Sequence, residues 1–291
     1  MTAVVEAGGE RRLELTELEF ERVCALLKSR TGIHLTDIKR RLVITRLAPR
    51  LRYTRTKSYS EYLDLVEDEG NEEAEHFLNA LTTNVTHFFR EPHHFALLRE
   101  RIFDTVVAQP ACSGRLRFWS AACSSGEEPY SLAIALLDAG LDQRGLDVRI
   151  LATDIDSQVL ARARRGEYQH DRVDKIPAPV LKRHFWKGSG SRSGLVRIKP
   201  PAQQLVHFTR LNLFDAWPMT GPFDVIFCRN VFIYFEPPAR EELTRRFHEL
   251  LGPRGYLFLG HSESMTGPTA SLFDSLGHTV FQKRHGSERN G

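Results

Sequence analysis

The feature that most constrains the fold is a regular alternation of short apolar runs and helical patterns after about residue 90. The apolar runs predict strands over Leu116–Ser120, Val148–Thr153, Val206–Leu211, Val225–Cys228 and Tyr256–Gly260. Helical patterns lie between several of these runs, at Pro129–Leu137, Ser157–Arg164 and Pro238–Leu251. This alternation is typical of an α/β domain in which a doubly wound, mostly parallel sheet carries helices on both faces.

The first part of the chain is different, with helical periodicity from Leu13 to about Leu81 and no strand signal. Thr16 and Glu19 have the spacing of a capping box, and Phe20, Val23 and Leu27 follow at helical spacing. Ser58 and Glu61 open another helix in the same way. We therefore predict a small all-helical domain over residues 1–88 and a larger α/β domain over residues 89–291, which a chain of 291 residues can accommodate.

Charge in the helical domain is separated into two blocks. Residues 38–60 contain eight Lys or Arg and no acid, whereas residues 61–75 contain eight acids and no base. Such blocks fit solvated helix faces that attract each other, and they fit a docking surface for an acidic partner equally well. Nucleic acid is less favoured as the partner, because Tyr53 is the only aromatic side chain between Lys39 and Lys57 that could stack on bases.

A glycine- and serine-rich turn, Gly188–Gly194, interrupts the alternation of the α/β domain. It lies between two segments that read as strands of a hairpin, Leu181–Lys187 and Leu195–Ile198. The sequence therefore predicts an inserted antiparallel β-subdomain at about residues 170–207. This insertion either covers the edge of the main sheet or offers an edge strand to a peptide.

The turn after the first predicted strand, Ser120–Pro129, has small residues but lacks the GxGxxG pattern of dinucleotide sites. Glu127 and Glu128 follow at the start of the next helix, where carboxylates disfavour a diphosphate and favour a cationic or neutral polar ligand. Asp154 ends the second strand, at the position where an acid accepts hydrogen bonds from ribose hydroxyls. A phosphate-free, cationic nucleoside such as S-adenosylmethionine fits both features, and NAD and ATP do not.

A third signal is the buried strand Phe223–Cys228, which is followed by the polar residues Arg229, Asn230 and Tyr234. Ligands of open α/β sheets bind outside the carboxyl ends of the strands, so we expect these side chains to face the crevice of Glu128 and Asp154. A loop hydrogen bond would explain Asn230 alone, and a core position would explain Tyr234 alone. Three converging strand ends favour a site.

Five segments in the same order resemble the CheR-type chemoreceptor glutamate methyltransferases over nearly the whole chain. They are Thr82–Phe95, Ser120–Ala133, Ala152–Asp156, Leu211–Leu213 and Phe223–Phe235. The resemblance implies a class I methyltransferase-like fold and transfer of a methyl group from S-adenosyl-L-methionine to glutamate carboxylates of bacterial chemoreceptors. The products would be glutamyl methyl esters and S-adenosyl-L-homocysteine. The resemblance also implies a receptor-facing basic helix and a β-subdomain that in some members holds a peptide at the receptor C-terminus.

The resemblance implies site residues as well. Those that would hold the methyl donor are Asn84, Thr86, Arg90, Glu128, Asp154, Asn212, Leu213, Arg229 and Asn230. Those nearest the transferred methyl group would be Arg90 and Tyr234. We expect Phe88 or Phe89 to pack at the domain junction. No metal is expected, because His87, His93 and His94 lack metal-ligand spacing with an acid or cysteine.

Two other functions remain open. A nucleic-acid methyltransferase could use the basic helices, but the Asn/Asp-Pro-Pro-Tyr/Phe turn expected after the fourth strand is replaced by Cys228–Phe235. A non-catalytic adaptor that binds S-adenosylmethionine is disfavoured by the acids at both donor positions. The four cysteines form no CxxC pair, and the chain has neither a signal-peptide pattern nor a membrane-spanning apolar run. We therefore expect a cytoplasmic protein.

Overall fold

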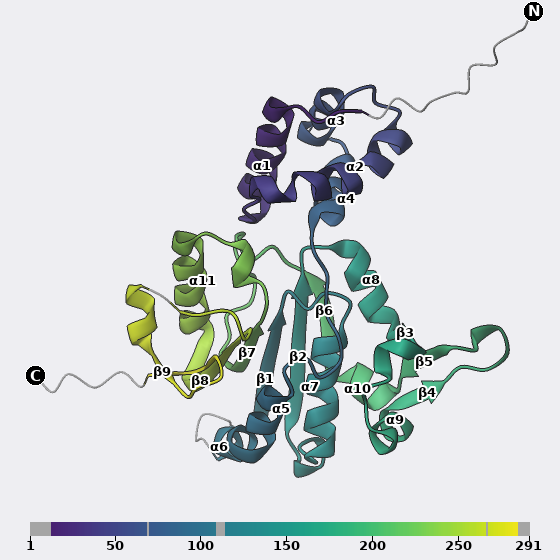
Figure 1. Ribbon diagram of the computed structural model, residues 1–291. Helices are drawn as coiled ribbons and strands as arrows, with labels where there is room; N and C mark the ends of the chain where they lie inside the picture. Colours follow the sequence, from purple (N-terminus) through teal and green to yellow (C-terminus); the bar gives the residue numbers. More distant parts are fainter. Residues whose placement is uncertain (1–12, 69, 109–113, 266, 285–291) are drawn as a thin grey trace, which may run out of the picture. The chain divides into compact units, whose positions relative to one another are not determined.

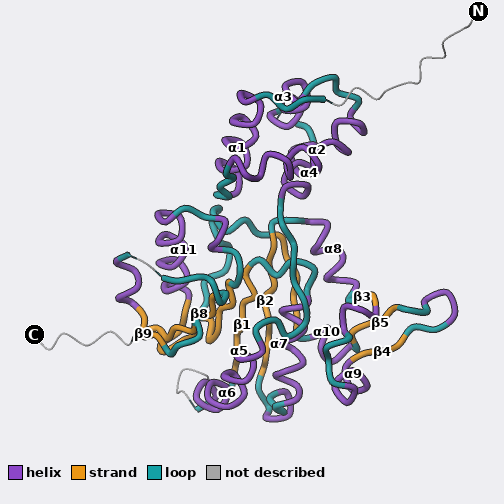
Figure 2. Tube along the Cα trace, viewed as in Figure 1, coloured by secondary structure: helices purple, strands orange, loops and turns teal. Residues whose placement is uncertain are grey.

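The structure is a computed structural model that describes residues 13–68, 70–108, 114–265 and 267–284. The chain divides into two compact units. The smaller unit holds the residues up to Arg30 together with His34–Thr82, and the larger holds Thr31–Ile33 and the chain from Thr83 onward. Figure 1 follows the chain by colour, and Figure 2 separates helices from strands.

The described part of the smaller unit is all-helical, as predicted. Its helices are α1 (Glu17–Thr31), the short η1 (Asp37–Lys39), α2 (Arg40–Thr54), α3 (Tyr59–Glu67) and α4 (Glu73–Leu81). The capping box forms, since Glu19 N donates to Thr16 Oγ1 over 3.3 Å and Thr16 N donates to Glu19 Oε2 over 2.9 Å. Ser58 Oγ caps α3 by accepting from Glu61 N over 3.1 Å. Phe20, Val23 and Leu27 are buried, so the predicted apolar face of α1 forms the core of this unit.

The two charge blocks of the smaller unit meet at one buried ion pair. Arg50 Nη2 lies 2.6 Å from Glu73 Oε2, and the Glu73 carboxylate also accepts the Tyr62 hydroxyl over 2.8 Å. Five other bases of the basic block are exposed and form no ion pair with any described residue: Lys39, Arg41, Arg52, Arg55 and Lys57. Attraction to the acidic block therefore explains the presence of only some of the basic residues.

The larger unit is built on a seven-stranded sheet with the order β6-β2-β1-β7-β8-β10-β9. Its strands are β1 (Arg115–Ala121), β2 (Asp147–Asp154), β6 (Val206–Arg210), β7 (Phe223–Cys228), β8 (Leu251–Leu259), β9 (Phe273–Ser275) and β10 (Val280–Lys283). The pairs β1–β2, β1–β7, β2–β6 and β7–β8 are parallel, and β10 runs antiparallel to β8 and β9. The five predicted strands are confirmed, and β9 and β10 were missed.

Alternate residues of the central strands enter two different cores, which shows that both faces of the sheet are covered. On β7, Val225 and Phe227 join one buried cluster, while Ile226 and Cys228 join the other. The helices of this unit outside the insertion include α5 (Pro92–Leu97), η2 (Leu98–Ile102), α6 (Phe103–Val107), α7 (Glu127–Asp138), α8 (Ser157–Arg165), α10 (Pro200–Gln204) and α11 (Pro237–Leu250). Side chains of α7 belong to the first cluster and those of α11 to the second.

A separate three-stranded antiparallel sheet forms the insertion, with the order β3-β5-β4 (Figure 1). Its strands are β3 (Glu167–Gln169), β4 (Phe185–Lys187) and β5 (Leu195–Ile198). The predicted hairpin across Gly188–Gly194 is confirmed by the pairing of β4 with β5. The prediction of a strand from Leu181 is wrong, since α9 (Ala178–His184) occupies that stretch. Pro179 fits the first turn of this helix, where its missing N–H would have no intrahelical acceptor. Val180 and Leu181 pack on the core, and the buried His184 follows them at helical spacing.

No helix within the described ranges is long and apolar enough to cross a membrane. Cys24, Cys123 and Cys228 are free thiols, and Cys112 lies outside the described residues.

Candidate active site

The turn after β1 is tight without the dinucleotide glycines. Ala122, Ser124 and Gly126 have left-handed φ angles of 59°, 50° and 94°. A Cβ on Gly126 would lie 2.8 Å from the Ala163 side chain, so the single glycine of the turn stands where the chain approaches α8 closely. Cys123 N donates to Thr153 O over 2.8 Å, which ties the turn to the end of β2.

Both acids at the start of α7 are occupied by protein partners. The Glu127 carboxylate pairs with Arg172 of the insertion and accepts the Ser125 hydroxyl over 2.6 Å. Glu128 accepts the Ser120 hydroxyl over 2.6 Å and Arg229 Nε over 3.0 Å. Burial raises the pKa of Glu128, although Arg229 opposes that shift. The crevice is therefore less negative than the sequence predicts.

Asp154, at the end of β2, is the buried acid that the turn surrounds. Its Oδ2 accepts from Ser124 N over 2.8 Å and its Oδ1 accepts from Asp156 N over 2.9 Å. Burial raises the pKa of Asp154 to about 6 despite these hydrogen bonds. An ionised carboxylate has about four acceptor sites, so Asp154 retains acceptor capacity for a ribose hydroxyl beside its backbone partners. In this respect the site fits an adenosine.

The segment before α5 contributes Asn84 and Thr86. Asn84 Nδ2 donates to Asp156 Oδ2 over 2.7 Å, and its carbonyl oxygen accepts the Ser124 hydroxyl over 3.3 Å. Thr86 O accepts from Arg172 Nη2 over 2.8 Å. The structure therefore brings Asn84 next to the β1 turn, and Thr86 next to Arg172, which pairs with Glu127 at the start of α7.

Arg229 is buried, and each of its three guanidinium nitrogens has a protein partner. Besides Glu128, it donates to the Arg90 carbonyl oxygen over 2.7 Å and to His94 Nδ1 over 3.1 Å. It also lies over the Phe227 ring, 5.4 Å from the centroid. Arg229 thus links the end of β7 to the segment that carries Arg90 and to the start of α7.

A buried acid that sequence reasoning missed, Glu263, shapes the loop after β7. Its carboxylate accepts backbone N–H groups of Gly260, Asn230 and Ile233 over 2.5, 2.8 and 3.3 Å. Asn230 has a left-handed φ of 61°, and Tyr234 follows at the end of η7 (Phe232–Tyr234). Glu263 therefore fixes the backbone on which both predicted residues stand. An acid soon after the end of a central strand was the available sequence signal.

Arg90 lies in a strained segment, since Phe89 and Glu91 on either side of it have φ angles of 52° and 57°. Its Nη1 donates to Val85 O over 2.8 Å. Phe88 packs edge-to-face against Tyr168 and Phe185 of the insertion, with ring centroids 4.9 and 5.4 Å away. The insertion is therefore anchored beside Arg90.

The expectation that His93 and His94 lack an acid at ligand spacing is wrong, because Glu91, His93 and His94 bring ligand atoms within 4.8 Å of one another. Burial would raise the pKa of Glu91, but Arg229 and hydrogen bonds from His261 lower it to about 2. His94 Nε2 donates to His278 O over 2.7 Å, while its Nδ1 faces the Arg229 guanidinium. Burial and Arg229 lower the pKa of His94 to about 4. The adjacent guanidinium charge opposes a cation here.

Asn212 and Leu213 follow β6. Asn212 Oδ1 accepts from Phe214 N over 3.1 Å, Asn212 Nδ2 donates to Asp215 over 3.0 Å, and Leu213 is buried in the second core. The predicted residues thus come from the segment before α5, from the start of α7 and from the ends of β2, β6 and β7. All of them belong to the larger unit.

The strand order, with an antiparallel β10 between β8 and β9, and the acid at the end of β2 define a class I methyltransferase-like domain. The family described as "CheR methyltransferase, SAM binding domain" matches residues 84–281, and "CheR methyltransferase, all-alpha domain" matches residues 18–82. The chain belongs to the CheR methyltransferase family and is an S-adenosylmethionine-dependent methyltransferase.

Relatives cover almost the whole chain. Chemotaxis protein methyltransferase 2 of Pseudomonas aeruginosa is 43% identical over 274 residues, which are 94% of this chain and 95% of that protein. The chemotaxis protein methyltransferase of Escherichia coli is 43% identical over 93% of this chain and 92% of its own length. A probable chemotaxis protein methyltransferase of Rhizobium etli is 37% identical over 88% of this chain and 96% of its own length.

Proposed function

We propose that the protein methylates glutamate side chains of bacterial chemoreceptors in the cytoplasm, with S-adenosyl-L-methionine as donor and S-adenosyl-L-homocysteine as product. The observation that carries the donor assignment is the buried Asp154 carboxylate, held by Ser124 N in a turn without phosphate-binding glycines. The acceptor assignment rests on similarity to the chemotaxis protein methyltransferases. The proposal requires neither a metal nor nucleic acid.

In this proposal, Asp154 accepts the ribose hydroxyls, and Glu128 with Asn230 borders the cationic end of the donor. Arg229 acts by holding Glu128, since its guanidinium already has three protein partners. Asn84, Thr86, Asn212 and Leu213 complete the donor site from the neighbouring loops. When bound, the donor supplies an electrophilic methyl group on a sulfonium.

The acceptor side needs no general base. A glutamate side chain has a reference pKa of about 4.3, so it is already ionised at neutral pH. Arg90 holds the acceptor carboxylate by a charge-assisted hydrogen bond, and the Tyr234 hydroxyl orients its second oxygen. Positioning of this kind can supply about 7 to 11 kcal/mol of the barrier reduction. Arg90 must not neutralise the carboxylate fully, because that would weaken the nucleophile.

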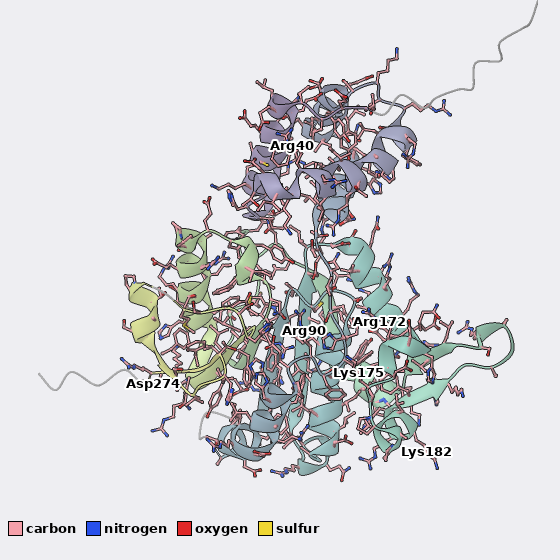
Figure 3. The ribbon with its side chains drawn as sticks, in the orientation of Figure 1. Arg40, Arg90, Arg172, Lys175, Lys182 and Asp274 are labelled. Carbon is pink, nitrogen blue, oxygen red and sulfur yellow. The ribbon has the colours of Figure 1, made fainter. Side chains whose placement is uncertain are left out.

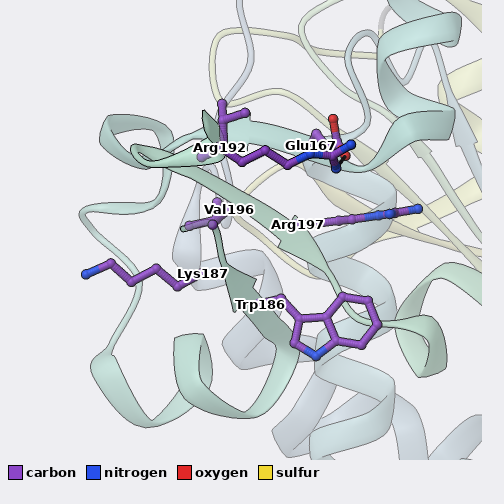
Figure 4. A pocket seen from close by; sticks show the side chains of 8 residues that line it. Glu167, Trp186, Lys187, Arg192, Val196 and Arg197 are labelled. Atoms are coloured by element: carbon purple, nitrogen blue, oxygen red, sulfur yellow. Dashed lines mark hydrogen bonds and ion pairs between the residues drawn. The ribbon is translucent and has the colours of Figure 1, made fainter. Parts of the chain in front are cut away.

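We extend the proposal to a receptor C-terminal peptide bound by the insertion. A pocket on this sheet is lined by Glu167, Trp186, Lys187, Gly188, Arg192, Leu195, Val196 and Arg197 (Figure 4). Trp186 and Lys187 belong to β4, which is an edge strand and can pair with an extended peptide. Trp186 is 49% exposed and offers an apolar contact, while the bases suit an acidic peptide.

The test is to incubate the protein with methyl-labelled donor and receptor-containing membranes. Label released as methanol by mild alkali identifies a carboxyl ester, as we expect. Alkali-stable label would instead identify an amine or a nucleic-acid base and would contradict the proposal. No incorporation despite donor binding in calorimetry would favour the adaptor function.

A further inference from the structure

Two guanidinium groups are anchored at neighbouring peptide groups of an exposed segment. Arg90 Nη1 donates to Val85 O and Arg172 Nη2 donates to Thr86 O, each over 2.8 Å. Adjacent residues are about 3.8 Å apart along the chain, so these two cations flank a single short stretch. Val85 itself is 74% exposed, and His87, two residues further on, is exposed too. The segment therefore faces solvent between two arginines.

Several positively charged side chains act on His87. Burial lowers the pKa of His87, and the charges of Arg90, Lys175, Arg229 and Arg172 lower it further. Arg90, Lys175 and Arg172 therefore create a positive potential together at the segment.

The cations of this surface differ in whether they form an ion pair with an acid of the protein. Arg172 pairs with Glu127 and is 42% exposed in its side chain. Arg90 and Lys175 form no ion pair with an acid in the described parts of the chain, and Lys175 is exposed. In Figure 3, Arg172 and Lys175 lie on the same side of the larger unit as Arg90, whereas Lys182 lies apart on α9.

We propose that Arg172 and Lys175, which lie beside the acceptor-binding Arg90, form a cationic rim that binds carboxylates flanking the acceptor glutamate on the substrate protein. The inference rests on the proposed function, since it assigns the rim to the acceptor side of that site. Rim charges of this kind act on encounter and specificity more than on chemistry. An acidic protein segment is the partner we expect, because the most exposed side chain of the segment, Val85, offers an apolar contact beside the cations.

Lys175→Glu is the informative variant, because Lys175 has no ion pair to lose among the described residues. Substituting Arg172 would leave the buried Glu127 without its cation and could impair folding. Lys182→Glu is the matched control, since it makes the same charge change at another exposed lysine of the insertion. The probes are two synthetic helical peptides with one acceptor glutamate each. In one, the neighbouring residues are glutamates, and in the other they are glutamines.

Binding of each peptide is measured by fluorescence anisotropy in the presence of S-adenosylhomocysteine, and methyl transfer is measured in parallel. We expect Lys175→Glu to weaken binding of the glutamate-flanked peptide about five- to tenfold and to raise its KM similarly. The glutamine-flanked peptide, kcat and product affinity should not change, and Lys182→Glu should behave as wild type. Added salt should weaken binding of the glutamate-flanked peptide selectively.

Equal losses of affinity for both peptides, or equal effects of the two lysine variants, would contradict the proposed rim. So would a single-stranded oligonucleotide that displaces the peptide at lower concentration than an acidic competitor. Failure of the proposed function is distinguishable: wild-type protein would then transfer no methyl group to either peptide. Because the anisotropy comparison needs no turnover, it decides on the rim in that case as well.

Discussion

The two sides of Arg90 handle charge in opposite ways. On the donor side, the buried carboxylates of Glu127, Glu128 and Asp154 each have two or more protein partners. On the cationic rim, Lys175 is exposed and has no carboxylate partner in the described chain. Buried charges must be paired because desolvation is costly, whereas exposed charges can remain unpaired in water. The donor side therefore holds its charged groups in place before the donor binds, whereas the rim has exposed charge with which to select an acidic substrate.

The largest effect should come from Arg229→Ala, which leaves Glu128 buried without its cation. The pair is only 1% and 11% exposed in its side chains, so we expect a loss of about 3 to 5 kcal/mol in the free energy of unfolding. Denaturant unfolding measures it, with the exposed Arg245→Ala as control. Stability within about 1 kcal/mol of wild type would show that the donor side is not preorganised as described.

Asp154→Ala should lower donor affinity about a hundredfold, because two hydrogen bonds to an ionised group are lost. Calorimetry with S-adenosylhomocysteine measures the affinity, and circular dichroism checks that the fold persists. Asp154→Asn retains one acceptor oxygen, so its donor affinity should lie between those of wild type and Asp154→Ala. Unchanged affinity in Asp154→Ala would refute the ribose assignment.

Tyr234→Phe separates transfer from donor binding. The side chain keeps its packing but loses the hydroxyl that orients the acceptor, so we expect kcat to fall about tenfold at unchanged donor affinity. Arg90→Ala should reduce both kcat and donor affinity, since Arg90 lies between the donor side and the cationic rim. Full turnover by either variant would remove that residue from the site.

Donor affinity should also depend on pH. The pKa of Asp154 is raised to about 6 by burial, and its protonated form accepts hydrogen bonds poorly. Affinity should therefore be half-maximal near pH 6, approach its full value above about pH 7 and fall towards a tenfold loss for each pH unit below the pKa. Calorimetry between pH 5 and 8 measures the profile. Asp154→Asn should flatten it, and an unaltered profile in that variant would assign the titration to another group.

The smallest effect concerns ionic strength. Raising salt from about 0.05 to 0.3 M should lower kcat/KM for receptor about threefold, because exposed charges are screened. Product affinity should change less, since the donor-side charges are buried. Lys175→Ala should show a weaker salt dependence than wild type. Equal dependence would mean that Lys175 does not contribute to encounter.

The helical unit and the five parallel strands could be predicted because their signals are local. The capping box at Thr16 needs only residues three apart, and the apolar runs mark each strand directly. The helix at Ala178–His184 was missed because its last four residues were also read as the start of a hairpin strand. So short a segment does not distinguish helical from strand periodicity. The short strands β9 and β10 carry too few residues for a clear period.

By itself, the sequence determined the fold class, the family and the donor turn, because strand alternation and motif spacing are properties of adjacent residues. Only the tertiary structure decided which charges are paired. Glu128 meets Arg229 from 101 positions away, and Glu127 meets Arg172 from 45 positions away. The spatial order of the strands in the sheet brings such residues together. This order cannot be deduced from the spacing of residues along the chain. For the same reason the role of Glu263 and the open charge of Lys175 emerged only from the folded chain.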